Sequence, residues 1–181
     1  MSKIYFGGSR HLQAPSPLVA SVVQSVLAAG HSVHVGCCVG ADALVIQSAL
    51  VCFVRSSLVV FAVSHPSGKG AFSLSSSMPG FAQKAGAVVH WQAGGSLSVP
   101  LRGRLISRSL AALAGCSAAV FFSPGSGSLA VASHAVSQSI PVFAFQEQAP
   151  APVPGCAGQW VQSSFQGLPC WSWQSAQLSF I

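Results

Sequence analysis

The stretch AAVFFSPGSGSLAVASHA, residues 118–135, decides the fold. Its apolar start predicts a buried strand over 118–123, its small residues predict a loop over 124–128, and its remainder predicts a helix that runs to about Gln138. A chain that passes from a strand through a Gly/Ser loop directly into a helix presents backbone N–H groups at the positive helix end. Such an end favours phosphate or another anion.

The loop at the centre of this stretch contains the first candidate binding residues. Glycine lets a ligand approach the backbone closely, and serine adds a hydroxyl donor or a helix cap. The candidates are Gly125, Ser126, Gly127 and Ser128. A structural alternative stays open, because the same residues also suit a well-capped turn between a strand and a helix.

Strand and helix patterns alternate on both sides of this stretch. Further strands are predicted over 3–7, 32–36, 57–63, 87–91 and 141–145. Helices are predicted over 15–30, from Gly40 through Phe53, over 81–85 and over 101–114. This alternation predicts an α/β, Rossmann-like fold, with a mainly parallel sheet and helices on both faces.

Two expectations concern arginines on the predicted helices. Arg55 is expected at the solvated end of the second helix. In the helix over 101–114 the apolar residues are expected to face the core and the arginines to lie elsewhere. The apolar set is Leu105, Ile106, Leu110 and Leu113, and the arginines are Arg102, Arg104 and Arg108.

The chain is expected to divide near residue 146. Residues 1–146 are predicted to form the Rossmann-like domain. Residues 147–181 begin with a Pro-rich linker over 149–155 and continue with an uncharged segment that carries Trp160, Trp171 and Trp173. That tail could pack back on the domain or dock on a partner.

Charged residues make up only 6% of the 181 residues, against 51% hydrophobic ones. So uncharged a surface predicts a homo-oligomer or a protein partner. Eight basic and two acidic residues give a net charge of +6, which attracts phosphate groups and permits nucleic-acid binding without indicating a dense basic patch.

The six cysteines form no regular framework, and the first residues are not a signal peptide, so a reduced cytoplasmic protein is predicted. His34, Cys37 and Cys38 match no zinc spacing, and neither a metal nor a cofactor is predicted. Polar residues interrupt the apolar run over 44–63, which favours two core elements over a membrane span.

Ligands of parallel α/β sheets bind where loops leave the carboxyl ends of the strands. Four such loops, or the helices that follow them, carry candidate residues. They are Gly7, Gly8, Ser9 and Arg10 in the first, Gly36 to Gly40 followed by Asp42 in the second, Arg104 and Arg108 in the fourth, and Gly125 to Ser128 in the fifth. Backbone donors, hydroxyls and guanidinium groups together suit a phosphate-bearing ligand.

Several of these residues have two interpretations. Asp42, one of only two acids, could hold a ribose hydroxyl or brace the glycine loop, or it could cap its own helix. Arg104 and Arg108 lie four residues apart, so they could act together or form a solvated helix face.

In this order and at strand ends, these motifs resemble the SLOG superfamily over about residues 3–145. That superfamily contains Rossmann-like proteins, among them the DNA-processing protein A family and the LOG "lysine decarboxylase-like" phosphoribohydrolases. Residues 102–107, RGRLIS, and residues 126–129, SGSL, are most similar to the DNA-processing branch. The resemblance to that branch implies binding of single-stranded DNA and a recombinase.

Two departures and one missing residue limit what the resemblance implies. The second loop has Gly36-Cys37 in place of a glycine pair, and the chain is short. The phosphoribohydrolases carry a glutamate after the fifth loop, whereas this chain has Ala130 to Ala132 there, so the hydrolysis lacks its general acid/base.

The predicted function is therefore non-catalytic binding of a nucleotide or nucleotide-derived phosphate ligand at the carboxyl edge of the sheet. The alternative is a DNA-processing protein that binds single-stranded DNA. A nucleoside-monophosphate hydrolase with Asp42 as its acid is disfavoured, and no catalytic residue is assigned.

Overall fold

A computed structural model describes residues 1–52 and 57–176. Two expectations, Phe53 in the second helix and Arg55 at its solvated end, lie outside the described residues, as do residues 177–181 of the tail.

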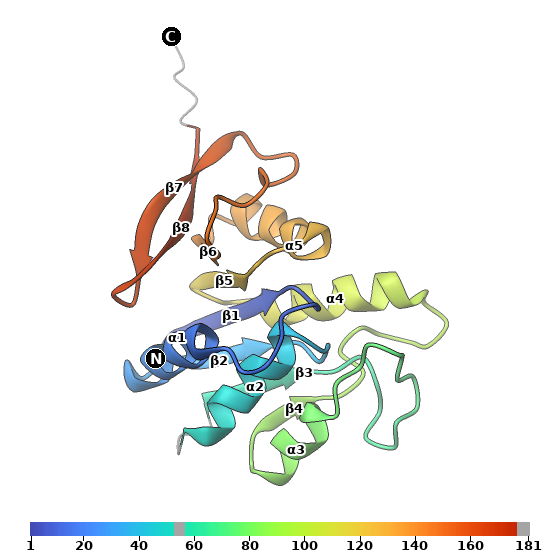
Figure 1. Ribbon diagram of the computed structural model, residues 1–181. Coiled ribbons are helices and arrows are strands. Elements are labelled where there is room, and N and C mark those ends of the chain that lie inside the picture. Colours follow the sequence, from blue (N-terminus) through green and yellow to red (C-terminus); the bar gives the residue numbers. More distant parts are fainter. Residues whose placement is uncertain (53–56, 177–181) are drawn as a thin grey trace.

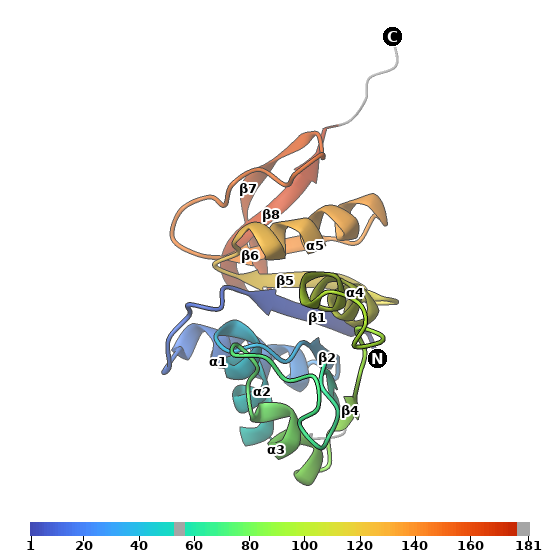
Figure 2. The same ribbon diagram turned by 90° about the vertical axis from the view of Figure 1, so that its right-hand side faces the viewer.

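The fold is α/β, with one eight-stranded sheet in the order β4-β3-β2-β1-β5-β6-β8-β7. Six strands are parallel: β1 (Lys3–Gly8), β2 (Ser32–Val35), β3 (Leu58–Phe61), β4 (Val88–His90), β5 (Ala118–Phe122) and β6 (Val142–Phe145). An antiparallel hairpin, β7 (Gly158–Phe165) and β8 (Leu168–Ser175), extends the sheet beyond β6. The hairpin and β4 lie at opposite ends of the molecule (Figures 1 and 2). The predicted Rossmann-like, mainly parallel architecture is confirmed.

Helices cover both faces of the sheet. One face packs against α1 (Pro17–Ala28), α2 (Ala41–Val51) and α3 (Met78–Lys84), and the other against α4 (Leu101–Leu113) and α5 (Ser126–Ser137). Strand alternation produces the two cores. Phe6 of β1 packs with the apolar residues of α1 and α2, whereas its neighbour Tyr5 packs with Leu113 of α4 and Val131 of α5.

The fifth helix begins earlier than predicted. Gly125 is its N-cap, and the Leu129 N–H donates to the Gly125 carbonyl at 2.9 Å to close the first turn. Ser126, Gly127 and Ser128 therefore belong to the first turn of α5 and not to the loop. A glycine N-cap is sufficient to start a helix, so the chain needs no serine side chain in that role.

The prediction for the buried face of α4 is wrong in part. Leu113 is buried as expected, but Ile106 is 43% exposed, and the helix buries Arg104 and Arg108 instead. The physical reason is that both guanidinium groups find polar partners beneath the helix, as described below. Charges that have partners can be buried, so α4 directs its arginines, and not its whole apolar stripe, toward the interior.

The tryptophan-bearing tail packs back on the domain, one of the two possibilities left open. Ala144 of β6 pairs with Trp171 of β8, whose indole N–H donates to the Gln146 carbonyl at 3.2 Å. Trp173 enters the second core and meets Trp160 edge-on. Among residues 1–52 and 57–176, no helix is both long and apolar enough to cross a membrane.

Candidate functional site

The strand order places a topological switch point between β1 and β5. From β1 the chain proceeds outward through β2, β3 and β4, and it then returns to the other side of β1 to form β5 and β6. In open parallel sheets the crevice at such a point, outside the carboxyl ends of the two strands, is the usual ligand site. The loops after β1 and β5 are therefore the natural candidates.

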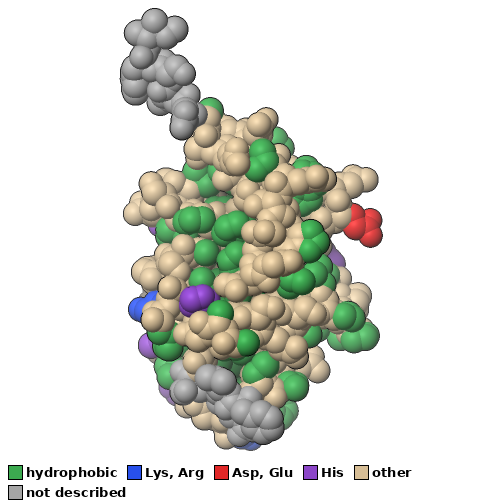
Figure 3. All heavy atoms as spheres, turned by 90° about the vertical axis from the view of Figure 1, so that its left-hand side faces the viewer, with side chains coloured by type: hydrophobic (Ala, Val, Ile, Leu, Met, Phe, Trp, Pro, Cys, Tyr) green, Lys and Arg blue, Asp and Glu red, His purple; other side chains and the backbone are tan. Residues whose placement is uncertain are grey.

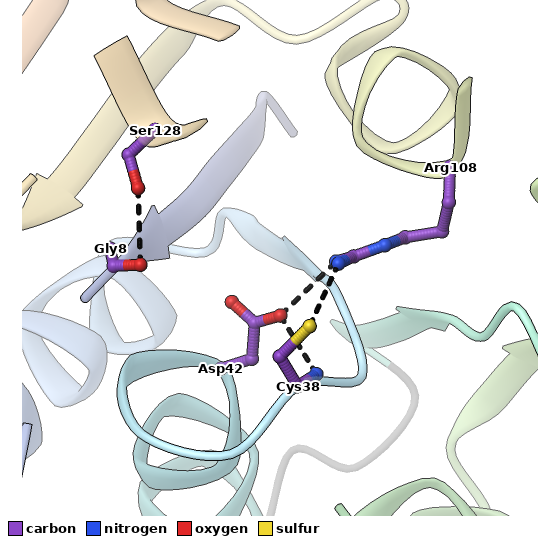
Figure 4. A network of polar contacts seen from close by, with 5 residues as sticks. All are labelled: Gly8, Cys38, Asp42, Arg108 and Ser128. Carbon is purple, nitrogen blue, oxygen red and sulfur yellow. Dashed lines mark hydrogen bonds and ion pairs between the residues drawn. The ribbon is translucent and has the colours of Figure 1, made fainter. Parts of the chain in front are cut away.

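Hydrogen bonds fasten the loop after β1 to its neighbours on this edge. The Ser128 hydroxyl, on α5, donates to the Gly8 carbonyl at 3.1 Å (Figure 4). The Ser9 N–H donates to the Phe122 carbonyl at 2.9 Å, and the Ser9 carbonyl accepts from the Ala41 N–H at 2.9 Å. Three predicted loops, the first, second and fifth, thus meet at one rim.

Two of the predicted glycines are required by packing. A Cβ on Gly8 would overlap the Phe122 carbonyl, and a Cβ on Gly40 would overlap the Ser9 carbonyl. Gly40 also has φ +77°, a conformation that other residues rarely adopt. Gly7 lies buried against the Tyr5 ring. Glycine at these positions lets the neighbouring loops pack closely together, and a larger side chain there would not fit.

The first turn of α5 is different, because it is open. A Cβ on Gly125 or on Gly127 would meet nothing, and no side chain of the described residues caps the helix. The first N–H groups of any helix lack intrahelical acceptors. Hydrogen bonding in α5 starts only at Leu129, and Gly125, Ser126 and Gly127 before it are exposed.

Asp42 and Arg108 come together, but inside the molecule. The Arg108 Nη1 lies 3.1 Å from the Asp42 Oδ2, and only 4% of Arg108 and 7% of Asp42 are exposed (Figure 4). The same carboxylate oxygen accepts the Cys38 N–H at 3.0 Å, and the Arg108 Nη2 donates to the Cys38 Sγ at 3.3 Å. Asp42 therefore braces the second loop.

Electrostatics in this cluster follow from burial and pairing. Burial alone would lower the pKa of the Arg108 guanidinium, but attraction to Asp42 and the nearby thiols leaves that pKa raised. Burial raises the pKa of Tyr5, on the adjacent strand. Arg108 is thus a fixed cation that compensates Asp42, and its charge is not available at the rim.

Arg104 lies elsewhere and has other partners. Its Nε donates to the Val99 carbonyl at 3.2 Å and its Nη1 to the Gly70 carbonyl at 3.4 Å. It therefore ties together the loops that follow β3 and β4. The two helix arginines do not act as a pair, and the alternative of a solvated face is wrong because both are buried.

Arg10 is the predicted arginine that stays exposed at the rim. It follows Ser9 directly, and its backbone lies against Gly40 at the start of α2. With Arg104 and Arg108 buried, Arg10 is the one side-chain cation that the predicted set leaves for a ligand.

Gly36 and Cys38 lie in the predicted second loop, but the sequence interpretation missed their contacts with Arg108 of α4. A Cβ on Gly36 would overlap the Arg108 guanidinium, so this glycine makes the buried ion pair possible. The signal available in the sequence is the glycine at each end of the loop, Gly36 and Gly40. Nothing local in the sequence indicates that Cys38 contacts a residue of α4.

Among the described residues, no group of three or more His, Cys, Asp or Glu side chains is placed to hold a metal ion. Comparisons of the chain with protein-family models, curated proteins and solved structures found no match. The SLOG resemblance therefore stays a prediction from motifs.

Proposed function

We propose that this protein is a non-catalytic binding protein that holds the phosphate group of a nucleotide or nucleotide-derived ligand at the β1–β5 switch point. The observation that carries the proposal is the open first turn of α5. Its glycines face free space, whereas Gly8 and Gly40 on the same rim are enclosed by backbone. Uncapped N–H donors at a positive helix end, beside the exposed Arg10, suit an anionic group.

The polar residues of the rim favour binding over hydrolysis. Asp42, the acid that a hydrolase would need, is paired with Arg108 and buried. The residues that follow the first turn of α5 are Ala130, Val131 and Ala132, which supply no general acid/base.

The distribution of cations favours a small ligand over DNA. A single-stranded DNA site uses a basic groove that contacts several phosphates. Burial of Arg104 and Arg108 removes two of the cations that such a groove would need. Arg10 alone can contact about one phosphate.

Thermal unfolding with a panel of nucleoside monophosphates and short single-stranded oligonucleotides tests this proposal. At about 100 times its Kd, a bound nucleotide stabilises the folded state by about 2.7 kcal/mol. We expect Arg10→Ala to weaken this effect. Arg102→Ala, which removes an exposed cation from α4, serves as the matched control and should leave the effect unchanged.

The salt dependence of affinity distinguishes a mononucleotide from single-stranded DNA as the ligand. A mononucleotide should respond shallowly to salt, whereas DNA affinity falls steeply in proportion to the phosphates contacted. If oligonucleotides alone stabilise the protein, with a steep salt dependence, the DNA alternative replaces the proposal. If neither class shifts the unfolding temperature, the proposed site is wrong.

A further inference from the structure

A groove adjoins the rim on the side of β6. It is open, holds about 610 Å³, and lies between the start of α1 and the carboxyl ends of β5 and β6. Its walls are mainly apolar and include Leu18, Phe122, Phe145 and, from the C-terminal hairpin, Pro169. This volume lies within the range of about 300–1,000 Å³ that is typical of small-molecule sites.

The groove and the open helix end share one loop. Ser123 lines the groove, and two residues later Gly125 caps α5. Ser123 has φ +45°, an uncommon conformation for a residue other than glycine, and its N–H donates to the Phe145 carbonyl at 3.1 Å. A ligand whose anionic end meets the first turn of α5 can therefore extend its remaining part into this groove.

Glu147 stands at the β6 side of the groove. The chain has only two acidic side chains, and the other, Asp42, is buried, so Glu147 is the one exposed acidic side chain of the described residues. Within the described residues, Glu147 makes no side-chain hydrogen bond and no ion pair. A carboxylate here repels phosphate, but it can accept two hydrogen bonds from neutral donors.

The segment that carries Glu147 is held in place by the hairpin. The Trp171 indole N–H donates to the Gln146 carbonyl at 3.2 Å, and the Gln146 side chain donates to the Gln148 carbonyl at 2.7 Å. The carboxylate is therefore attached to a braced backbone on either side, which favours a directed contact.

We propose that this groove binds the nucleoside part of the ligand, and that the Glu147 carboxylate accepts hydrogen bonds from the two hydroxyls of a ribose. The inference rests on the proposed function. It predicts a preference for ribonucleotides over 2′-deoxyribonucleotides. The vicinal hydroxyls supply two neutral donors to the carboxylate, the apolar walls cover the base, and the phosphate stays away from Glu147, at α5.

Calorimetric titration of the full chain with ribonucleoside monophosphates, their 2′-deoxy forms and inorganic phosphate tests the inference. We expect the intact protein to bind the best ribonucleotide about ten times more tightly than its 2′-deoxy form, the effect of losing one hydrogen bond to a charged group. Glu147→Gln should lower ribonucleotide affinity by a similar factor. The 2′-deoxy form keeps the 3′-hydroxyl and should lose less affinity than the ribonucleotide, whereas inorganic phosphate, which has no contact with Glu147, should bind as well or slightly better.

The outcomes separate the two proposals. If the nucleotides bind but neither Glu147→Gln nor removal of the 2′-hydroxyl matters, the groove inference is overturned and the proposed function stands. If Glu147→Gln weakens the binding of all three probes equally, Glu147 does not contact the ribose hydroxyls and the inference is also overturned. If no nucleotide binds to the intact protein, both proposals fail.

Discussion

At the scale of single residues, the most consequential feature is the charge pair beneath α4. Arg108 and Asp42 lie 66 residues apart in the chain, and their side chains are almost fully buried. The Arg108 Nε has no hydrogen-bond partner within residues 1–52 and 57–176. A buried ion pair gains little over an apolar pair of the same shape, but removal of one partner leaves an uncompensated charge.

We therefore expect Arg108→Met to destabilise the protein strongly, by about 3–5 kcal/mol, because Asp42 stays charged and buried. Arg102→Met is the control on the same helix, since Arg102 is exposed, and it should change the free energy of unfolding by no more than about 0.5 kcal/mol. Urea denaturation measures both.

A double variant sharpens this experiment. Adding Asp42→Asn to Arg108→Met removes the stranded carboxylate charge and should recover part of the lost stability. Equal, small effects of Arg108→Met and Arg102→Met would contradict the buried pair. Failure of the double variant to recover stability would mean that the loss comes from packing and not from charge.

At the scale of elements, α5 and α4 contrast in what their sequences disclose. The strand-to-helix transition before α5 is local, so its Pro-Gly-Ser-Gly-Ser composition was enough to predict that β5 ends there and that a helix follows. The burial of α4 is not local. Its apolar stripe indicated one inward face, but the partners of Arg104 and Arg108 come from loops distant in the chain.

Gly127 provides the test for α5. It lies in the first turn with no left-handed φ and open space around it, so Gly127→Ala should raise the free energy of unfolding by about 0.4–1 kcal/mol. In the proposed site the same methyl group obstructs the approach of a phosphate to the backbone, so nucleotide affinity should fall.

Gly80→Ala is the matched control. Gly80 also lies in a helix, α3, with nothing near its missing Cβ. This variant should stabilise the protein similarly and leave nucleotide affinity unchanged. If Gly127→Ala binds nucleotides as well as the unmodified chain does, the ligand does not approach the first turn of α5.

At the scale of the whole molecule, a surface with few charged residues is combined with an edge strand that carries none. Figure 3 shows one face of the molecule with few charged side chains. One of the two edge strands, β7, is eight residues long and contains no charged residue and no proline, the usual protections of an edge strand. A second copy of the chain could pair antiparallel with it, which accords with the expected homo-oligomer.

We expect the protein to self-associate through β7, and expect Gln162→Lys to shift it toward the monomer, because the two-fold pairing brings the added charges close together. Gln174→Lys adds the same charge to β8, an inner strand, and should have little effect. Sedimentation velocity over a range of concentrations measures both. A monomeric unmodified chain, or equal effects of the two variants, would contradict this expectation.

The local periodicity of the chain was sufficient for the α/β alternation, for the strands that form the parallel sheet, and for the loops at its carboxyl edge. These features depend on neighbouring residues, whose apolar spacing and glycines are visible in a short window. The candidate rim could be predicted for the same reason, since parallel strands bring their carboxyl ends to one edge.

Tertiary contacts alone determined which polar groups remain open at that edge. Arg108 is buried because Asp42 and Cys38 meet it from α2 and the loop before it, and Glu147 lines a groove whose other walls come from α1, β5 and the hairpin. Such pairings join residues that are far apart in the chain. Their energy depends on exclusion of water and on the position of the partner, and no short window of sequence contains either.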